Sequence, residues 1–268
     1  MVVALGVLAF MVALALLADV LSPYDPDAQL SLERLAGHPP SLLHPMGNDP
    51  YSRDILSRVL HGTRVSLGVA ALALAVAMGV GTAYGALAGM AGDRVDALLM
   101  RLVDALLSIP RVLLLIMLVA LWGQITVPRL VVFLGLTSWF GVSRLVRGEV
   151  RALREREFVL AARALGAGGP AIFRRHLLPN LATPLLVSAT LVVRTVILLE
   201  AGLSFFGYGV PQPTASWGSI IRDGADQVAT HWWITVFPGL AIVLTVLALD
   251  ALGDGLREAL DPRQLPRP

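Results

Sequence analysis

The segment from Val65 to Gly92 contains no charged residue. It is longer than the roughly 20 apolar residues that an α-helix needs to cross the hydrocarbon core of a bilayer. Backbone polar groups inside a bilayer must find their partners within the spanning structure, and a single apolar segment achieves this as a helix. This one segment therefore predicts an integral membrane protein of the all-α class.

Composition extends this prediction to the whole chain. Of the 268 residues, 56% are hydrophobic and 15% are charged, whereas soluble domains carry about 25% charged residues. The apolar segments predict a single transmembrane domain, residues 1–268, with about six spanning helices. The expected spans are residues 2–18, 65–90, 106–127, 130–147, 181–206 and 232–250. Residues 93–104 are expected to form a short charged turn.

The first expected span is close to the lower limit of length for a membrane helix. A secretory signal peptide is the alternative, because its apolar region has a similar length. Such a peptide begins with positive charge, and residues 2–18 contain none. The sequence therefore favours a membrane helix.

Polar segments separate the spans. Residues 19–63 and 207–231 are expected to form two loops on one side, and residues 148–180 a loop on the other. In the first loop, Asp49 and Pro50 resemble an N-cap and first helical position, which predicts a short interfacial helix. Within the second span, small residues recur every four positions and predict close packing against another helix. These small residues are Ala77, Gly81, Gly85 and Gly89.

The distribution of arginine predicts the orientation. All 21 basic residues are arginine, and most lie after the second span, after the fourth span or in the C-terminal tail. Loops rich in basic residues remain in the cytoplasm. Residues 148–180 and both termini are therefore expected to be cytoplasmic, and the loops 19–63 and 207–231 extracytoplasmic. The expected extracytoplasmic side holds fewer arginines, namely Arg34, Arg53, Arg58, Arg64, Arg129 and Arg222.

The composition argues against catalysis. Without lysine, the chain can form neither a Walker-type phosphate loop nor a Schiff base, and without cysteine it has no thiolate chemistry. No pair of carboxylates suits acid–base catalysis, and the five histidines are scattered; metal binding by His38 and His44 is the alternative to an ordinary loop role. The arginine-rich loop lacks the interleaved aromatic residues that stack on bases, so no nucleic acid is expected as a partner.

Two charged residues fall inside the fifth expected span. Arg194 and Glu200 are expensive to place in a bilayer, and such residues normally face a bundle interior or an aqueous path. Both are candidates for lining a translocation path. Six residues separate them, so they lie on different helical faces and no ion pair between them is expected. An interfacial position is the alternative for Glu200.

The most distinctive polar segment runs from Glu157 to Asn180. Its first half reads as a short helix, because apolar residues recur at the spacing of one helical face. The run from Gly166 to Gly169 breaks that helix, Pro170 suits the first position of a second helix, and Pro179 is expected to end it. Two short exposed helices between membrane spans predict a rigid element that a partner can bind.

This segment resembles the cytoplasmic coupling loop, or EAA loop, of ABC importer permeases. Ala161-Ala162, Gly166 and Leu178-Pro179 stand at the spacing of that family. The runs Ala-Ala-Arg-Ala-Leu-Gly and Arg-His-Leu-Leu-Pro-Asn are similar to the second permease subunit of the peptide and nickel branch. Leu160 stands where the family carries the glutamate that names the motif, so Glu157 or Arg163 is a candidate for the ionic contact.

The resemblance implies a fold of the type I ABC importer permease and a role in coupling for eight residues. They are Glu157, Ala161, Ala162, Arg163, Gly166, His176, Pro179 and Asn180. It further implies a homologous second permease, two ATP-binding subunits that hold ATP and magnesium, and an extracytoplasmic substrate-binding protein. The chain itself is then non-catalytic, without a cofactor, and resident in a bacterial or archaeal cytoplasmic membrane. Short peptides are the expected substrate, with nickel or another small solute as the alternative.

Two other functional classes are weaker. A secondary transporter working without an ATPase predicts internal repeats or paired broken helices, and the sequence shows no convincing repeat. An integral membrane enzyme requires a cluster of polar residues, which the sequence lacks. The secondary-transporter class also leaves the segment from Glu157 to Asn180 unexplained.

Overall fold

A computed structural model describes residues 1–123 and 125–260, and within them the chain is helical, with no β-strand. This confirms the expected all-α class. The longer helices are α1 (Val2–Leu16), α4 (Ile55–Met90), α5 (Asp93–Leu107), α6 (Arg111–Trp122), α7 (Val127–Arg154), α8 (Glu157–Ala164), α10 (Leu178–Phe205), α11 (Trp217–Gly224) and α12 (Trp233–Ala259). The short ones are α2 (Ala18–Leu21), α3 (Leu32–Leu35), α9 (Gly169–Ile172), a π-helical turn (Phe173–Leu177) and a 3-10 turn (Ala225–Gln227).

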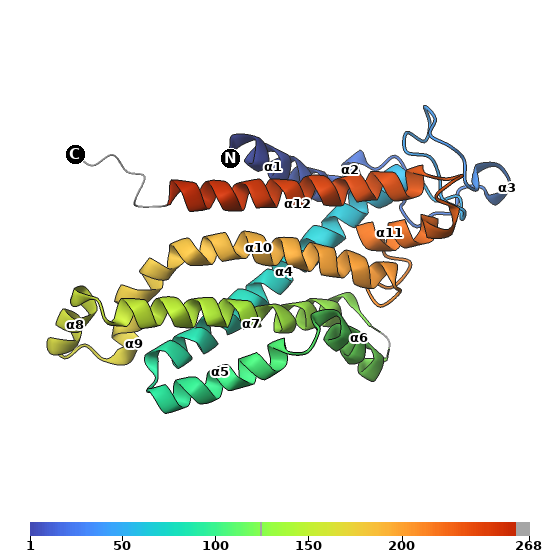
Figure 1. The fold of residues 1–268 in the computed structure, drawn as a ribbon. Coiled ribbons are helices and arrows are strands. Elements are labelled where there is room, and N and C mark those ends of the chain that lie inside the picture. The colour runs from blue at the N-terminus through green and yellow to red at the C-terminus, as the bar shows by residue number, and fades with distance from the viewer. Residues whose placement is uncertain (124, 261–268) are drawn as a thin grey trace.

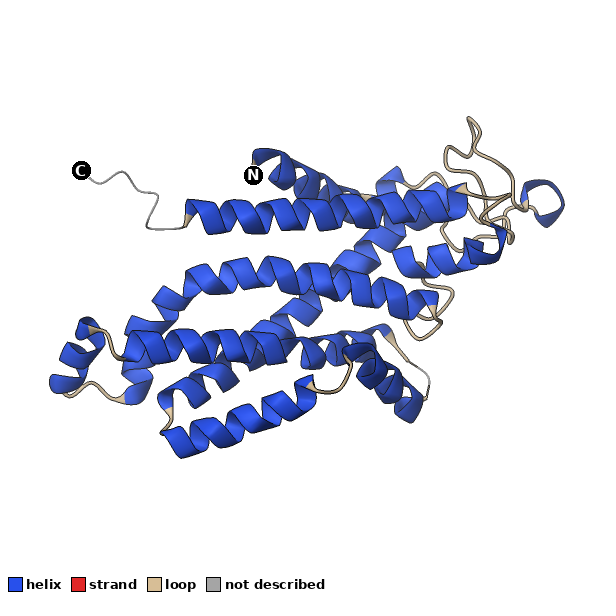
Figure 2. Ribbon diagram, viewed as in Figure 1, coloured by secondary structure: helices blue, strands red, loops and turns tan. Residues whose placement is uncertain are grey.

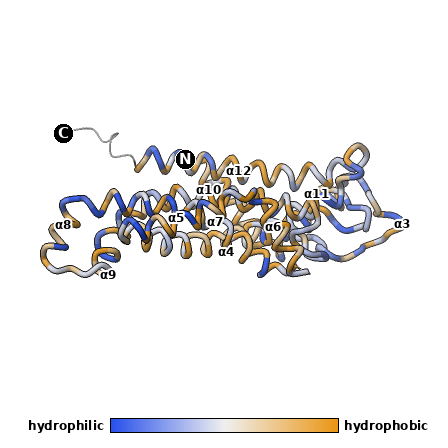
Figure 3. Tube along the Cα trace, turned by 60° about the horizontal axis from the view of Figure 1, so that its bottom comes forward, coloured by the Kyte–Doolittle hydropathy of each residue, from blue (hydrophilic) through white to orange (hydrophobic). Residues whose placement is uncertain are grey.

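The long helices form an elongated bundle with irregular segments at both ends (Figures 1 and 2). Helices α8 and α9 project at one end, which we call the α8 end. The loop that carries α3 lies at the opposite end, which we call the α3 end, beside α11. Apolar residues predominate along the middle of the bundle, while hydrophilic residues gather towards both ends (Figure 3). This distribution is the one expected of a bundle that crosses a bilayer.

Within the described residues, four helices have the length and apolar composition to cross a membrane: α4, residues 169–205, α7 and α12. They contain the expected spans 65–90 and 130–147, and all but one residue of each of 181–206 and 232–250. The expected span 2–18 appears as the apolar helix α1, whose 15 residues reach only about 22 Å. Counting one bent helix pair as a span raises the number to five.

That bent pair replaces the expected span 106–127. Residues 93–104, expected as a turn, belong to the helix α5, which is followed by α6 at a bend of 82°. Pro110 stands at the break, directly before α6. The charges of α5 do not prevent helix formation, because Asp96 is buried against Arg147 and Arg151 of α7, with Asp96–Arg151 at 2.6 Å. Because these partners lie more than 50 residues apart in the sequence, local sequence patterns do not predict the pairing.

The start of α4 also differs from the sequence prediction. Asp54, and not Asp49, is the N-cap: its carboxylate accepts a hydrogen bond from Ser57 N at 2.8 Å. The Asp49 carboxylate instead closes a turn by accepting from the backbone nitrogens of Tyr51 and Arg53. Residues 55–63, expected within the polar loop, therefore continue α4 into the apolar segment without interruption.

The small-residue stripe of α4 packs against α7 as expected. A Cβ atom added to Gly85 would lie 2.4 Å from the backbone oxygen of Ser143 and 2.8 Å from Cβ of Val146. Added Cβ atoms on Gly81 and Gly89 would similarly meet Val142 and Val150. The backbones of the two helices are thus in direct contact, which only glycine permits.

We expect Gly85→Ala to lower the free energy of unfolding by about 1–3 kcal/mol, because the new methyl group would overlap backbone atoms. Gly79→Ala in the same helix is the matched control, since a Cβ there meets nothing within 4 Å and helix propensity alone favours alanine by up to about 1 kcal/mol. Thermal unfolding of the two variants in detergent measures the difference. Equal stability would show that the α4–α7 contact is looser than described.

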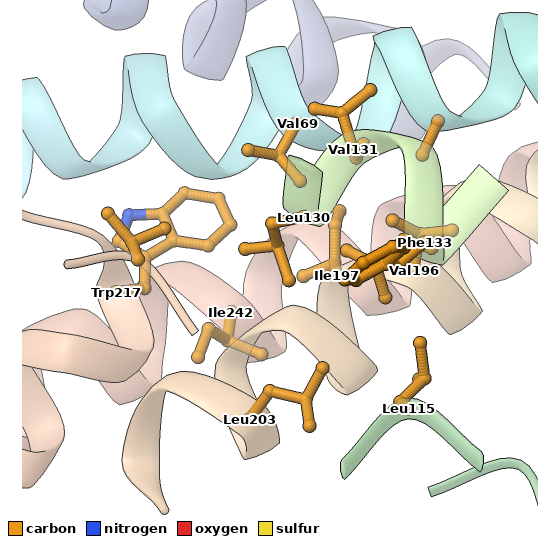
Figure 4. Packing of buried hydrophobic residues seen from close by; sticks show 14 of the residues in the cluster. Val69, Leu115, Leu130, Val131, Phe133, Val196, Ile197, Leu203, Trp217 and Ile242 are labelled. Atoms are coloured by element: carbon orange, nitrogen blue, oxygen red, sulfur yellow. The ribbon is translucent and has the colours of Figure 1, made fainter. Parts of the chain in front are cut away.

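The largest apolar core lies where α4, α7, α10, α11 and α12 meet (Figure 4). Trp217 at the start of α11 is fully buried there, and its indole Nε1 donates to Thr63 Oγ1 at 3.1 Å. Its backbone nitrogen donates to Ser66 Oγ at 3.2 Å. Helix α11 is thereby fixed against α4 at the α3 end.

Charged residues are buried in pairs at the α3 end. Asp223 of α11 accepts from Arg53 Nη2 at 2.8 Å and from Arg58 Nη2 at 3.2 Å. Arg53 also pairs with Asp49, and Arg58 is fully buried. This ionic cluster joins the first loop, α4 and α11. Since an unpaired buried charge is strongly destabilising, each of these charges depends on its partners in the other elements.

The same end contains a more exposed ionic contact. The carboxylate of Asp19 in α2 accepts from Arg64 Nη1 and Nη2 at 3.0 Å and lies 3.1 Å from Nε2 of His61. Hydrogen bonds from Arg64 and then His61 lower the pKa of the Asp19 carboxyl below its ordinary value. The contact links α2 to α4.

Candidate functional site

The candidate site is built on α8, which begins directly after the long helix α7. One residue of α8, Val159, faces inward and is fully buried. It belongs to an apolar cluster with Val150 of α7, Ile172 of α9 and Leu177 of the π-helical turn. The short helix is therefore anchored to the bundle by its inner face.

The outer face of α8 is exposed and largely apolar. Phe158 is 42% exposed, Leu160 49% and Leu165, just beyond the helix, 89%. Ala161 is exposed between them, and Ala162 is half-buried. An apolar face with small side chains at its centre suits close contact with a protein partner.

The charged members of the predicted set lie on the exposed side of the loop. Glu157 at the start of α8 and Arg163 near its end are both exposed. Their carboxylate and guanidinium groups are accessible to a partner. Both residues are therefore placed where either can make the ionic contact expected in place of the family's glutamate.

Gly166 turns the chain between α8 and α9. Its φ of +86° lies in the region that glycine adopts without steric penalty, and a Cβ there would meet nothing within 4 Å. The backbone conformation therefore favours glycine at this position, and the position faces open space. Sequence reasoning placed the helix break here correctly.

The second half of the loop differs from the prediction. Pro179 does not end a helix, because residues 169–205 form one helix that passes through a π-helical turn at Phe173–Leu177. Pro179 is in the first turn of α10, where its missing N–H is tolerated after the change in hydrogen-bond pattern. The side chain of Asn180 donates to the backbone oxygen of His176 at 2.7 Å across this region. His176 is half-buried, with its ring centroid 6.3 Å from that of Phe158.

A pocket of about 700 Å³ separates α8 and α9 from the turn between α4 and α5. Leu160 and Arg163 line it on the α8 side. On the opposite side, Arg154 Nη1 donates to the backbone oxygens of Gly89 at 3.0 Å and Ala91 at 3.2 Å. These bonds fix the end of α7 to the end of α4, so α8 projects from a rigid pair of helices.

The two charged candidates of the fifth span have separate partners. Arg194 Nη1 donates to Asp250 Oδ1 of α12 at 2.8 Å. Glu200 is fully buried and accepts from Ser204 Oγ at 2.7 Å and Ser66 Oγ at 3.1 Å. As expected, they do not form a pair with each other. Glu200 is placed in the junction of α4, α10 and α11 rather than at the surface.

Sequence reasoning missed a cavity of about 940 Å³ between the α5–α6 break, α7, α10 and the end of α12. Arg111 lines it, and its guanidinium donates to Thr137 Oγ1 at 3.3 Å, to Ser138 Oγ and to Leu134 O at 3.4 Å. The available signal was the charge of Arg111, next to Pro110, within the otherwise apolar residues 106–127. Among the residues that the structure describes, no group of three or more His, Cys, Asp or Glu side chains is placed to hold a metal ion.

Comparison with protein families now identifies the chain. Residues 81–265, which include the segment from Glu157 to Asn180, match the profile of the binding-protein-dependent transport system inner membrane component. The chain belongs to this family. Residues 1–40 match a second profile, the N-terminal transmembrane domain of oligopeptide transport permease C. This permease is therefore a membrane component of a transport system.

Two similar proteins carry functional names. The dipeptide transport system permease protein DppC of Bacillus subtilis is 38% identical over 97% of this chain and 80% of its own length. A protein of Brucella suis, provisionally named a peptide transport system permease protein, is 43% identical over 93% of this chain and 84% of its own length. Both similarities cover more than nine-tenths of this chain.

A solved structure supports the fold. The methionine ABC transporter MetNI, determined in inward-facing conformations, contains a chain that superposes with a TM-score of 0.62 at 20% identity. The match covers 76% of this permease and 96% of that chain. The fold of the type I ABC importer permease, expected from the coupling loop, is confirmed.

Proposed function

We propose that this permease is the second membrane subunit of an ATP-driven importer of short peptides. The observation that carries the proposal is the way α8 packs on the bundle: its inner face is buried at Val159 and its outer face is exposed. A short helix fixed to a membrane bundle and exposed on its far side can transmit a displacement in either direction. The names of the relatives in Bacillus and Brucella support a peptide as the solute.

The partners follow from this role. A homologous second permease would complete the translocation path, and two ATP-binding subunits would contact the two coupling loops. ATP and magnesium would be held by those subunits, since this chain lacks the lysine of a phosphate-binding loop. An extracytoplasmic binding protein would deliver the solute to the α3 end.

The orientation is part of the proposal. The arginine distribution supports placing the α8 end and both termini in the cytoplasm and the α3 end outside. The chain would thus be a multi-pass protein of a bacterial or archaeal cytoplasmic membrane. Within this arrangement, Glu157, Ala161, Ala162, Arg163, Gly166, His176, Pro179 and Asn180 form or support the surface that contacts the ATPase.

Nickel or another small solute is the alternative substrate. The scattered histidines favour peptides, because a relay for a soft or borderline metal ion uses imidazole or thiolate ligands. An importer reconstituted with its binding protein would discriminate between labelled dipeptides and nickel.

Affinity purification of the chain from its native membrane in mild detergent tests the proposal, with the accompanying chains identified by mass spectrometry. We expect a second permease and ATP-binding chains in stable association. Recovery of the chain alone or only with itself, even after gentle crosslinking, would favour a transporter that works without an ATPase.

A further inference from the structure

The cavity beside Arg111 extends from the middle of the bundle to the α8 end. Its inner part is lined by Thr137 of α7 and Thr195 of α10. Thr137 lies about 15 Å along α7 from Val127, near half the depth of a bilayer core, at 1.5 Å per residue. The outer part is lined by Glu149, Thr183 and Arg257 close to the coupling loop. The cavity therefore connects mid-membrane depth with the proposed cytoplasmic side.

Arg111 is an unusual residue at this depth. Within residues 1–123 and 125–260, the recorded partners of its guanidinium are the hydroxyl oxygens of Thr137 and Ser138 and the backbone oxygen of Leu134, which are all neutral. The structure records no ion pair for Arg111 in those residues. The other charged wall residue of α7, Glu149, lies about 16 Å from Ser138 along the helix.

The position of Arg111 in its helix increases the energetic cost of the unpaired charge. It is the first residue of α6, where the helix dipole is positive and disfavours a cation. Every other residue of α6 is uncharged. A cation at mid-membrane depth with neutral partners is a functional site by default, because an anion would offset both penalties.

The walls of the cavity indicate the kind of anion. Apolar side chains from α6, α7 and α10 surround the polar groups, including Leu114, Phe140 and Leu191. On α10, Ser188 and Thr195 add hydroxyl groups. A solute with a carboxylate at one end and a mixed polar and apolar body would match this surface. The planar guanidinium can bind a carboxylate through two parallel hydrogen bonds.

We propose that Arg111, together with Thr137 and Ser138, binds the carboxylate of the transported solute inside the membrane. This inference rests on the proposed function, in which the solute is a short peptide and the carboxylate is its C-terminus. The site would hold the peptide after the binding protein has released it. A carboxylate of the second permease is the other source of the same chemistry, and the test separates the two.

The first experiment uses the complete importer with its binding protein in proteoliposomes. Uptake of a dipeptide and of its C-terminal amide is measured for the wild type, for Arg111→Gln and for the control Arg101→Gln, whose arginine is exposed on α5. The measured quantity is the acid-to-amide ratio, which is the uptake of the dipeptide divided by the uptake of its amide. The same binding protein serves all three permeases, so its preference for either substrate affects the three ratios equally. We expect this ratio to fall roughly tenfold or more in Arg111→Gln, because a charge-assisted hydrogen bond is lost, and to stay constant in Arg101→Gln. An unchanged ratio in Arg111→Gln, or an equal loss of both substrates, would overturn the proposal.

The second experiment separates failure of this inference from failure of the peptide assignment. The complete transporter in lipid nanodiscs is treated with phenylglyoxal, and modification of Arg111 and Arg101 is quantified by mass spectrometry. The dipeptide and acetate, but not the amide, should protect Arg111, and none should protect Arg101. If the wild type imports neither peptide yet acetate protects Arg111, the peptide assignment is wrong and the carboxylate site stands. Equal labelling under all conditions, or an Arg111 already unreactive without any solute because a partner carboxylate holds it, would refute the site.

Discussion

Replacing Ala161 by glutamate is expected to abolish ATP-driven uptake while the chain still inserts into the membrane. Ala161 is exposed at the centre of the outer face of α8, so the new side chain disturbs no internal packing. In the proposed contact with the ATPase, however, it would bury an unpaired charge. Such a charge costs about 3–5 kcal/mol, which corresponds to a loss of affinity of more than about 100-fold. Uptake into proteoliposomes and copurification of the ATP-binding chains measure the two effects.

The matched control is Ala152→Glu, which introduces the same side chain at an exposed position of α7, before the coupling loop. It should retain both uptake and the ATP-binding chains. Gly166→Glu should resemble Ala161→Glu in uptake, with added backbone strain because of the positive φ at this residue. Normal uptake by Ala161→Glu would exclude the outer face of α8 as the coupling surface.

Removing the carboxylate of Asp223 should cause the largest loss of stability at the α3 end. In Asp223→Ala, the only carboxylate left near the guanidinium of Arg58 would be the more distant Asp27, at 3.8 Å, beside the neutral backbone oxygen of Pro26. Arg53 would keep only the carboxylate of Asp49. Leaving buried charges without partners costs about 3–5 kcal/mol of the free energy of unfolding. Thermal unfolding of the purified complex in detergent, followed by the loss of helical circular dichroism, measures the change.

Asp226→Ala provides the control, because Asp226 is exposed three residues further along the chain. Its effect should stay within about 0.5 kcal/mol. Asp223→Asn should fall between the two, since the amide keeps one acceptor oxygen but not the charge. If Asp223→Ala and Asp226→Ala unfolded together, the ionic cluster would contribute nothing to stability.

The features that sequence reasoning located correctly are governed by local chemistry. Apolar length placed most of the spanning helices, and the spacing of small residues predicted the close contact that Gly85 makes with α7. Periodicity and glycine placed α8 and the turn at Gly166. In each case the decisive residues lie within one or two helical turns of each other.

The features that it missed depend on partners far away in the sequence. Residues 93–104 look too charged for a buried helix until Asp96 is seen against Arg147 and Arg151. Asp49 and Asp54 are equally good N-caps in isolation, and the backbone turn that Asp49 closes decides between them. The polar environment of Arg111 is likewise formed by residues of a different helix.

The continuous helix from Gly169 to Phe205 gives the molecule a mechanical connection between its two ends. Its 37 residues measure about 55 Å along the helix axis, so one bent helix reaches from the segment after α8 past the cavity. Pro184 lacks the N–H that would donate to the backbone oxygen of Asn180, so the helix is expected to bend at this residue. A swing of about 10° there moves the Phe205 end by about 5 Å. Since Pro184 also lines the cavity beside Arg111, a small displacement of α9 would change the width of the cavity that we propose as the solute site.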